Sequence, residues 1–307
     1  MKKLLAFTSI ILISSNLLIA QDVQFYHNDE GEKHLIGEYS VEYLKQDTTY
    51  SHWFNEGYAD FQLKEKDYNW AENLKDDTVE IYMGTWCGDS QEWVPRFVKL
   101  WDELGLDREQ LKFTALYGSG DNYKQGPNGE EKGLNIHRVP TFIFKEDGKE
   151  YARIVESPST DLLTDVAQIA SGYPSAPNYA GATYMLNLFD EKSMEEIYKD
   201  MNNVWRTLYY KVGRYAELNT LGNVLYAAGQ KDQALFAFNL NTAYYPGNWR
   251  VQERFAELLA EMEDYENAII FYEKVVQLNP ENEEAKLELE RIKKLQAEKE
   301  ETKKDAD

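Results

Sequence analysis

Residues 79–90 have the sequence VEIYMGTWCGDS and join a strand to a helix at the single cysteine of the chain. Val79 to Met83 is an apolar, partly β-branched run of strand length, and Gln91 to Leu104 carries apolar residues at helical spacing. Cys87 is therefore predicted to stand between the end of a strand and the start of a helix. Free backbone N–H groups and the helix dipole stabilise a thiolate at such a position.

Strands and helices continue to alternate after this stretch, up to about Gly172. Residues 118–133 are rich in glycine and asparagine and predict a surface loop. Glu146-Asp147-Gly148 predicts the turn of a β-hairpin. The other predicted elements are strands over residues 111–116, 139–144 and 151–155 and a helix over residues 161–170.

Two prolines add to the pattern around Cys87. Pro95 follows within the predicted helix, and Val139-Pro140 opens a strand, where proline is expected only at an edge or in a cis turn. Together with the Trp-Cys pair, these features resemble the thioredoxin family over about residues 77–172. The resemblance implies an α/β thioredoxin-like domain over residues 75–174, with a central mixed sheet flanked by helices and a cis Pro140.

The resemblance also implies a functional site. The first cysteine of the family's motif is the nucleophile, so Cys87 takes that role, and the turn before the cis-proline offers main-chain hydrogen bonds to a substrate peptide. Ser90 occupies the position of the second cysteine, so the thiol that resolves a mixed disulfide is missing. We therefore expect monothiol exchange, in which Cys87 forms a mixed disulfide with a protein or peptide client and an external thiol releases it. The residues expected to bind the substrate are Trp86, Gly88, Asp89, Ser90, Val139 and Pro140.

Other features of the motif leave a second interpretation open. Ile81 stands where the family has a buried carboxylate, and Glu80 is expected to face the other way. Ser90 could hydrogen-bond the Cys87 sulfur, whereas the charge of Asp89 opposes thiolate formation. A lone cysteine is more often a small buried residue than a nucleophile. The alternative function is thus a non-catalytic binding module, in which the thioredoxin fold and the C-terminal helices are interaction scaffolds.

The C-terminal part contains a 34-residue repeat. Small residues recur where two helices cross closely, large apolar residues recur between layers, and a proline ends each unit. The pattern resembles the tetratricopeptide repeat and predicts a helical region over residues 193–295 that docks a protein partner. Two units are expected, at about residues 215–248 and 249–282. The matched pairs are Leu221/Phe255, Gly222/Ala256, Leu225/Leu259, Ala234/Ala268, Phe238/Tyr272 and Pro246/Pro280.

The first twenty residues predict an export signal. Two lysines precede an apolar run, and cleavage is expected after Ala20. The product would then be periplasmic or secreted, with no membrane span left after cleavage. The alternative is that the uncleaved segment anchors the chain in the membrane.

The remaining segments carry no functional assignment. Residues 21–74 form an N-terminal extension, residues 175–192 a linker, and residues 296–307 a charged tail. Two repeat units bury little surface alone, so helices over residues 193–212 and 284–295 are expected to cover their ends.

Composition excludes several classes of function. The 307 residues include 33 Lys and Arg against 54 Asp and Glu, a net charge of −21, so nucleic acid is not an expected partner. One cysteine excludes an intramolecular disulfide, a cysteine-rich zinc site and an iron–sulfur cluster. We expect neither a metal nor a cofactor. Arg250 and Arg254 resemble part of a clamp for a peptide carboxylate, although solvated surface is the commoner role of such residues.

Overall fold

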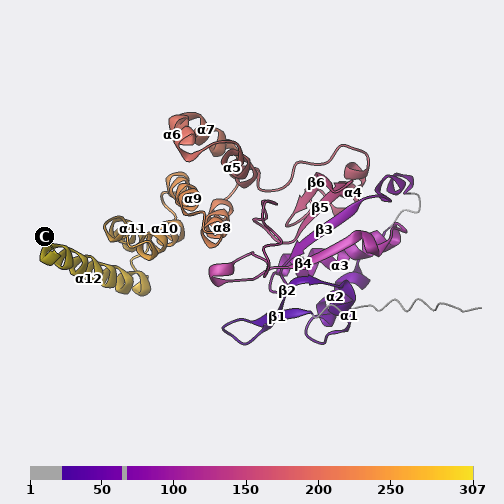
Figure 1. Ribbon diagram of the computed structural model, residues 1–307, viewed down its shortest axis with the longest axis horizontal. Coiled ribbons are helices and arrows are strands. Elements are labelled where there is room, and N and C mark those ends of the chain that lie inside the picture. Colours follow the sequence, from indigo (N-terminus) through magenta and orange to yellow (C-terminus); the bar gives the residue numbers. More distant parts are fainter. Residues whose placement is uncertain (1–22, 64–67, 307) are drawn as a thin grey trace, which may run out of the picture.

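The computed structural model describes residues 23–63 and 68–306 and has two parts (Figure 1). The first is a mixed β-sheet with helices, and the second is a succession of helices that ends in a long C-terminal helix. The expected order, a mixed sheet with flanking helices followed by an all-helical region, is confirmed. The predicted export signal over residues 1–20 lies outside the described residues.

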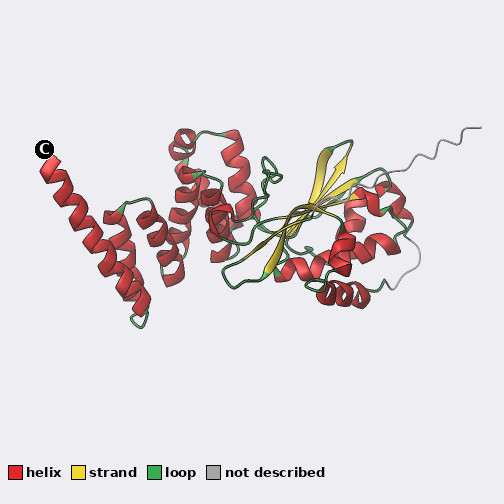
Figure 2. Cartoon of the chain, turned by 60° about the horizontal axis from the view of Figure 1, so that its bottom comes forward, coloured by secondary structure: helices red, strands yellow, loops and turns green. Residues whose placement is uncertain are grey.

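Six strands form one sheet in the described part of the chain, in the order β1-β2-β4-β3-β5-β6 (Figure 2). β3 and β4 run parallel, and every other neighbouring pair is antiparallel. β3 lies inside the sheet, with Ile81 opposite Phe113 on one side and Phe142 on the other. The strands are β1 (Gln24–His27), β2 (Lys33–Tyr39), β3 (Thr78–Met83), β4 (Leu111–Ala115), β5 (Thr141–Glu146) and β6 (Lys149–Val155).

Alternation along β3 separates the two faces of the sheet. Val79, Ile81 and Met83 are fully buried in the main core, which also contains residues of the α-helices α1 to α4. Tyr82 points to the other face and packs with Val139, where the chain between β4 and β5 covers the sheet. The helices are α1 (Val41–Gln46), α2 (Ser51–Asp60), α3 (Gly88–Glu103) and α4 (Leu162–Ala170).

Three segments differ from the sequence expectation. The extension over residues 21–74 is part of the sheet domain, because it supplies β1 and β2, and β2 pairs with β4. The linker expected over residues 175–192 is mostly helix α5 (Ala180–Glu191), whose apolar side chains pack into the helical core. The tail expected over residues 296–307 continues helix α12 (Glu283–Ala306), in which oppositely charged side chains three residues apart form ion pairs.

Helix pairs build the repeat region. α8 packs along α9 and α10 along α11, so the helices fall within the two expected units. A Cβ atom on Gly222 of α8 would lie 2.6 Å from the Phe238 ring of α9, and Ala256, one repeat later, is fully buried. The close crossings predicted at these small residues are confirmed. The helices are α6 (Met194–Lys199), α7 (Met201–Lys211), α8 (Tyr215–Ala227), α9 (Lys231–Tyr244), α10 (Trp249–Glu261) and α11 (Tyr265–Leu278).

Helices on both sides complete the core of the repeats. Ile197 and Leu208 enter it from α6 and α7, which divide at Asp200 instead of forming one helix. Ala285 and Ile292 enter it from α12. The expected cover at both ends is therefore present.

The crossing at Gly222 gives a stability prediction. We expect Gly222→Leu to lower the free energy of unfolding by about 2 kcal/mol, because the new side chain overpacks against Phe238. Ala228→Leu is the control, since Ala228 ends the same helix and is exposed, and its effect should stay within about 0.5 kcal/mol. Chemical unfolding followed by circular dichroism measures both. Equal effects would contradict the close packing of α8 on α9.

Candidate functional site

Cys87 lies at the start of α3, half-buried and next to the Val139-Pro140 turn. It is the N-cap residue of the helix, and its carbonyl accepts the first helical hydrogen bond, from the Gln91 N–H at 3.0 Å. Its thiol donates to the Val139 carbonyl, with 3.2 Å between Sγ and O. The Val139-Pro140 peptide bond is cis. The expected meeting of Cys87 with a cis-proline turn is thus present in the fold.

Trp86 forms a fixed wall beside the cysteine. Its indole N–H donates to the Leu116 carbonyl at 2.9 Å. Its ring lies against Gly118, where a Cβ atom would come within 2.8 Å of it, so only glycine permits this approach. The ring of Tyr123 packs beside the indole, with 6.1 Å between centroids. These contacts hold the half-buried indole in one place.

The other motif residues divide into exposed and buried ones. Gly88 and Asp89 are exposed in the first turn of α3, directly after Cys87. Ser90 differs from the expectation that it contacts a substrate: its side chain is fully buried, and its hydroxyl accepts from the Gly84 N–H at 3.2 Å. Its observed role is to hold the turn between β3 and α3. Glu80 faces away from the core, as predicted.

Lys124 is a site residue that sequence reasoning missed. The segment predicted to be a surface loop buries this lysine to 4% exposure, and its Nζ donates to the His137 carbonyl at 3.0 Å. The pKa of Lys124 is lowered to about 7, mainly by burial and to a smaller extent by the positive charge of Arg138. Burial also lowers the pKa of His137 to about 3, so that ring is neutral at physiological pH. No local pattern around Lys124 signals its burial, because long-range contacts create it.

Arg138 ties the cis-proline turn to the repeat region. Its guanidinium pairs with Glu156 at 3.0 Å and donates to the Ala216 carbonyl of α8 at 2.8 Å. It also lies 4.3 Å from the centre of the Tyr179 ring. The turn before Pro140 is therefore hydrogen-bonded directly to α8, the first helix of the first repeat unit.

A cavity of about 600 Å³ lies between the loop after β4 and the repeat helices. Gly118 and Tyr123, which contact Trp86, belong to its lining. Arg254 of α10 also lines it and is held by the Asn223 amide oxygen at 2.7 Å and by Glu257 at 2.9 Å. In Figure 1 the loop after β4, which lines one side of this cavity, projects from the sheet toward α8. The charge of Arg254 is paired with Glu257, which counts further against the alternative of a carboxylate clamp.

Comparison with known protein families identifies one part of the chain. Residues 250–282 match the tetratricopeptide repeat. The match coincides with the second unit predicted from the spacing and indicates protein–protein interaction. No curated protein matches the chain.

Two further observations concern only residues 23–63 and 68–306. None of the helices there is long and apolar enough to cross a membrane. Within the same ranges, no cluster of three His, Cys, Asp or Glu side chains is placed to hold a metal ion.

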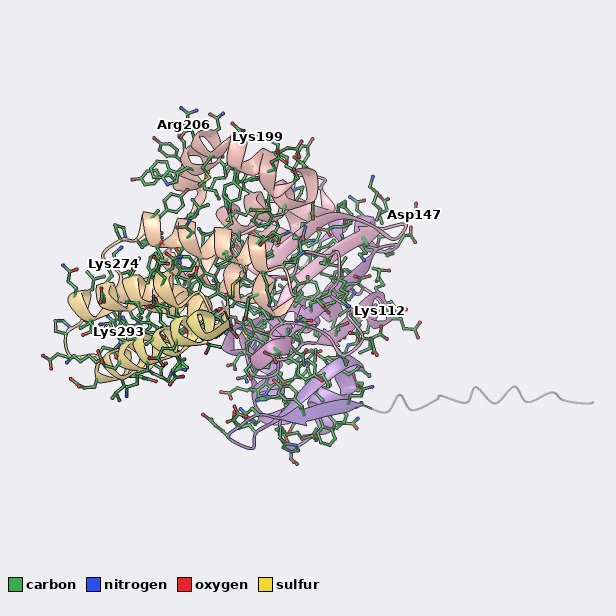
Figure 3. The ribbon with its side chains drawn as sticks, turned by 60° about the vertical axis from the view of Figure 1, so that its left-hand side comes forward. Lys112, Asp147, Lys199, Arg206, Lys274 and Lys293 are labelled. Atoms are coloured by element: carbon green, nitrogen blue, oxygen red, sulfur yellow. The ribbon has the colours of Figure 1, made fainter. Side chains whose placement is uncertain are left out.

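The Arg138 contacts give a second stability prediction. Arg138→Met should lower the free energy of unfolding by about 3 kcal/mol, because it leaves the largely buried Glu156 carboxylate without its closest partner. Arg206→Met is the control, since Arg206 lies on the outside of α7 (Figure 3) and should change stability by about 0.5 kcal/mol or less. Urea unfolding followed by tryptophan fluorescence measures both. Equal, small effects would contradict the structural role of the Arg138–Glu156 pair.

Proposed function

We propose that this chain is an exported thioredoxin-like protein that captures client proteins through Cys87 while its repeats dock a protein partner. The observation that carries the proposal is the Cys87 thiol at a helix start, 3.2 Å from the carbonyl that precedes a cis-proline. Val139 and Pro140, expected to bind the substrate, are buried, so a peptide that reaches the thiol would contact mainly the exposed Gly88 and Asp89. The tetratricopeptide match supports the docking role of the second part.

The proposed reaction is thiol–disulfide exchange. The Cys87 thiolate attacks one sulfur of a client disulfide, a new S–S bond forms, and the second client sulfur leaves as a thiolate. No net oxidation occurs in this step, because one disulfide replaces another. An external thiol must then attack the mixed disulfide to release Cys87 in its reduced form.

The position of Ser90 makes the mixed disulfide long-lived. A second thiol there would attack in place, at a very high effective concentration. The Ser90 hydroxyl is instead buried and bonded to the Gly84 N–H, and an alcohol does not reduce a disulfide. The adduct therefore persists until an external reductant arrives.

The repeats and the cysteine domain would act on one client together. The cavity between them has Tyr123 in its lining, and the ring of that residue packs on Trp86. A client segment held in this cavity would lie close to Trp86, which is next to Cys87 in the chain. This arrangement favours docking and exchange on the same protein.

Trapping of clients tests the proposal. Non-reducing gels of cell extracts should contain adducts of the parent protein that disappear with reductant and are missing with Cys87→Ala. Ser90→Cys should shorten their lifetime and create disulfide reductase activity, because it restores the second thiol. Near-ultraviolet circular dichroism of each variant checks that the fold is intact.

The same experiment separates the alternative function. If the parent gives no more adducts than Cys87→Ala, the exchange reaction is wrong and both domains act as non-catalytic binding scaffolds. That alternative is favoured by the absence of a second thiol at Ser90 and by the tetratricopeptide match.

Export is tested separately. The lysines and apolar run of residues 1–20 support it, and deletion of these residues should retain the protein in the cytoplasm. Cell fractionation with immunoblotting measures the distribution. A full-length chain found in the cytoplasm would contradict export, and one that stays with the membrane would support the uncleaved anchor.

A further inference from the structure

Lys124 is a buried charged group to which the proposed exchange at Cys87 gives no role. Its side chain has 4% exposure, and one carbonyl, that of His137, accepts from an ammonium that has three N–H groups to donate. The centre of the Tyr123 ring lies 5.0 Å from Nζ. Removing an ammonium from water is costly unless it gains a charged partner or several acceptors. Replacing this lysine with methionine should therefore raise the stability of the fold. The ammonium is kept at a cost, which space filling does not explain.

The backbone holds Lys124 firmly in this position. Its N–H donates to the Tyr117 carbonyl at 2.9 Å, and the Tyr117 N–H donates to the Gln125 carbonyl at 3.0 Å. The long loop is thereby closed at its base. The φ angle of Lys124 is +58°, a conformation that few residues other than glycine adopt. The direction of the side chain is thus fixed by the fold of the loop.

Lys124 and Cys87 contact the same short segment of chain. The ammonium binds the carbonyl of His137, and the thiol binds the carbonyl of Val139 two residues later. This segment continues into the cis Pro140. The two side chains therefore hold the turn that forms the wall of the site.

The charges around Lys124 show which group can balance it. Arg138 lowers its pKa, whereas Cys87, Glu156 and Asp89 raise it. Arg138 and Glu156 form an ion pair at 3.0 Å and largely cancel each other. Asp89 is exposed to water, which screens its charge. Among these groups, Cys87 once ionised is then the anion whose charge no ion pair cancels.

We infer that Lys124 is a positioning residue for Cys87: its ammonium holds the turn before Pro140 and supplies the positive charge that balances the thiolate. The neighbouring His137 ring, which is buried and neutral, cannot take this role. No bond forms at Lys124, and the proton lost by Cys87 goes to solvent. The inference rests on the proposed exchange reaction at Cys87.

Alkylation of Cys87 by iodoacetamide tests this inference in the intact protein. At about pH 6, Cys87 of Lys124→Met should be alkylated at least about tenfold more slowly than Cys87 of the parent. A nearby positive charge raises the ionised fraction of a thiol by about that factor. The difference should shrink above about pH 7, where Lys124 loses its charge. Lys124→Arg keeps its charge at every pH, so it should react like the parent at pH 6. Lys112→Met, at an exposed position of β4 (Figure 3), is the control and should match the parent throughout.

Thermal unfolding separates a charge effect from loosened packing. Folding lowers the pKa of Lys124 from 10.5 to about 7, so the folded chain binds this proton less tightly than the unfolded chain. The contribution of Lys124 to stability is therefore present above about pH 10.5 and is lost as the pH falls toward 7. Lys124→Met should raise the thermal midpoint most near pH 6 to 7 and least near pH 10. A slower reaction combined with a lower midpoint at pH 6 would indicate loosened packing and overturn the inference.

The remaining outcomes also decide the question. Identical alkylation profiles for the parent, Lys124→Met and Lys124→Arg overturn the inference. If Lys124→Met does not fold, Lys124→Arg decides alone. Arginine keeps its charge above about pH 7, where Lys124 loses it, so faster alkylation than the parent above that pH supports the role of the charge, and a profile identical to that of the parent overturns it. Alkylation requires no client, so Lys124-dependent alkylation without trapped adducts overturns the proposed exchange only. Trapped adducts with a Lys124-independent profile overturn only the role of Lys124.

Discussion

The contact between the Cys87 sulfur and the Val139 carbonyl holds the two halves of the candidate site together. It requires the last residues of β3 and the first residues of β5 to lie side by side, as they do in this antiparallel pair. A slip of one residue in that pairing would turn Ile81 out of the core and move the cysteine away from the turn. The buried side chains of β3 fix the register, so core packing also positions Cys87.

The turn before Pro140 receives support from outside the sheet as well. Lys124 binds it from the loop, and Arg138 links it to Glu156 and to the Ala216 carbonyl of α8. Burying these charges costs stability, and such cost is common where a fold maintains a functional arrangement. Because one of the links reaches the repeat region, movement of the repeats relative to the sheet would disturb the cysteine site directly.

Local periodicity accounts for the part of the fold that was predictable. The alternation in Val79 to Met83 and the 34-residue spacing report burial on one face and close helix crossings, both properties of nearby residues. The meeting of Cys87 with Pro140 followed from a family resemblance and not from spacing. Lys124 and the pairing of β2 with β4 escaped prediction because contacts between distant segments create them. Ser90 was expected to contact a substrate, and its burial against Gly84 depends on a turn geometry that no local pattern indicates.

An intact-mass measurement on the purified protein examines the proposed chemistry with no client or cell extract involved. The folded chain is mixed with the symmetrical disulfide of a small cysteine-containing peptide and sampled over time. We predict a mass increase of one peptide, located on Cys87 by digestion, which persists without reductant and disappears when a thiol is added. If the folded chain gains no mass while the urea-unfolded chain does, the Cys87 thiol is unreactive in the fold and the exchange function is wrong.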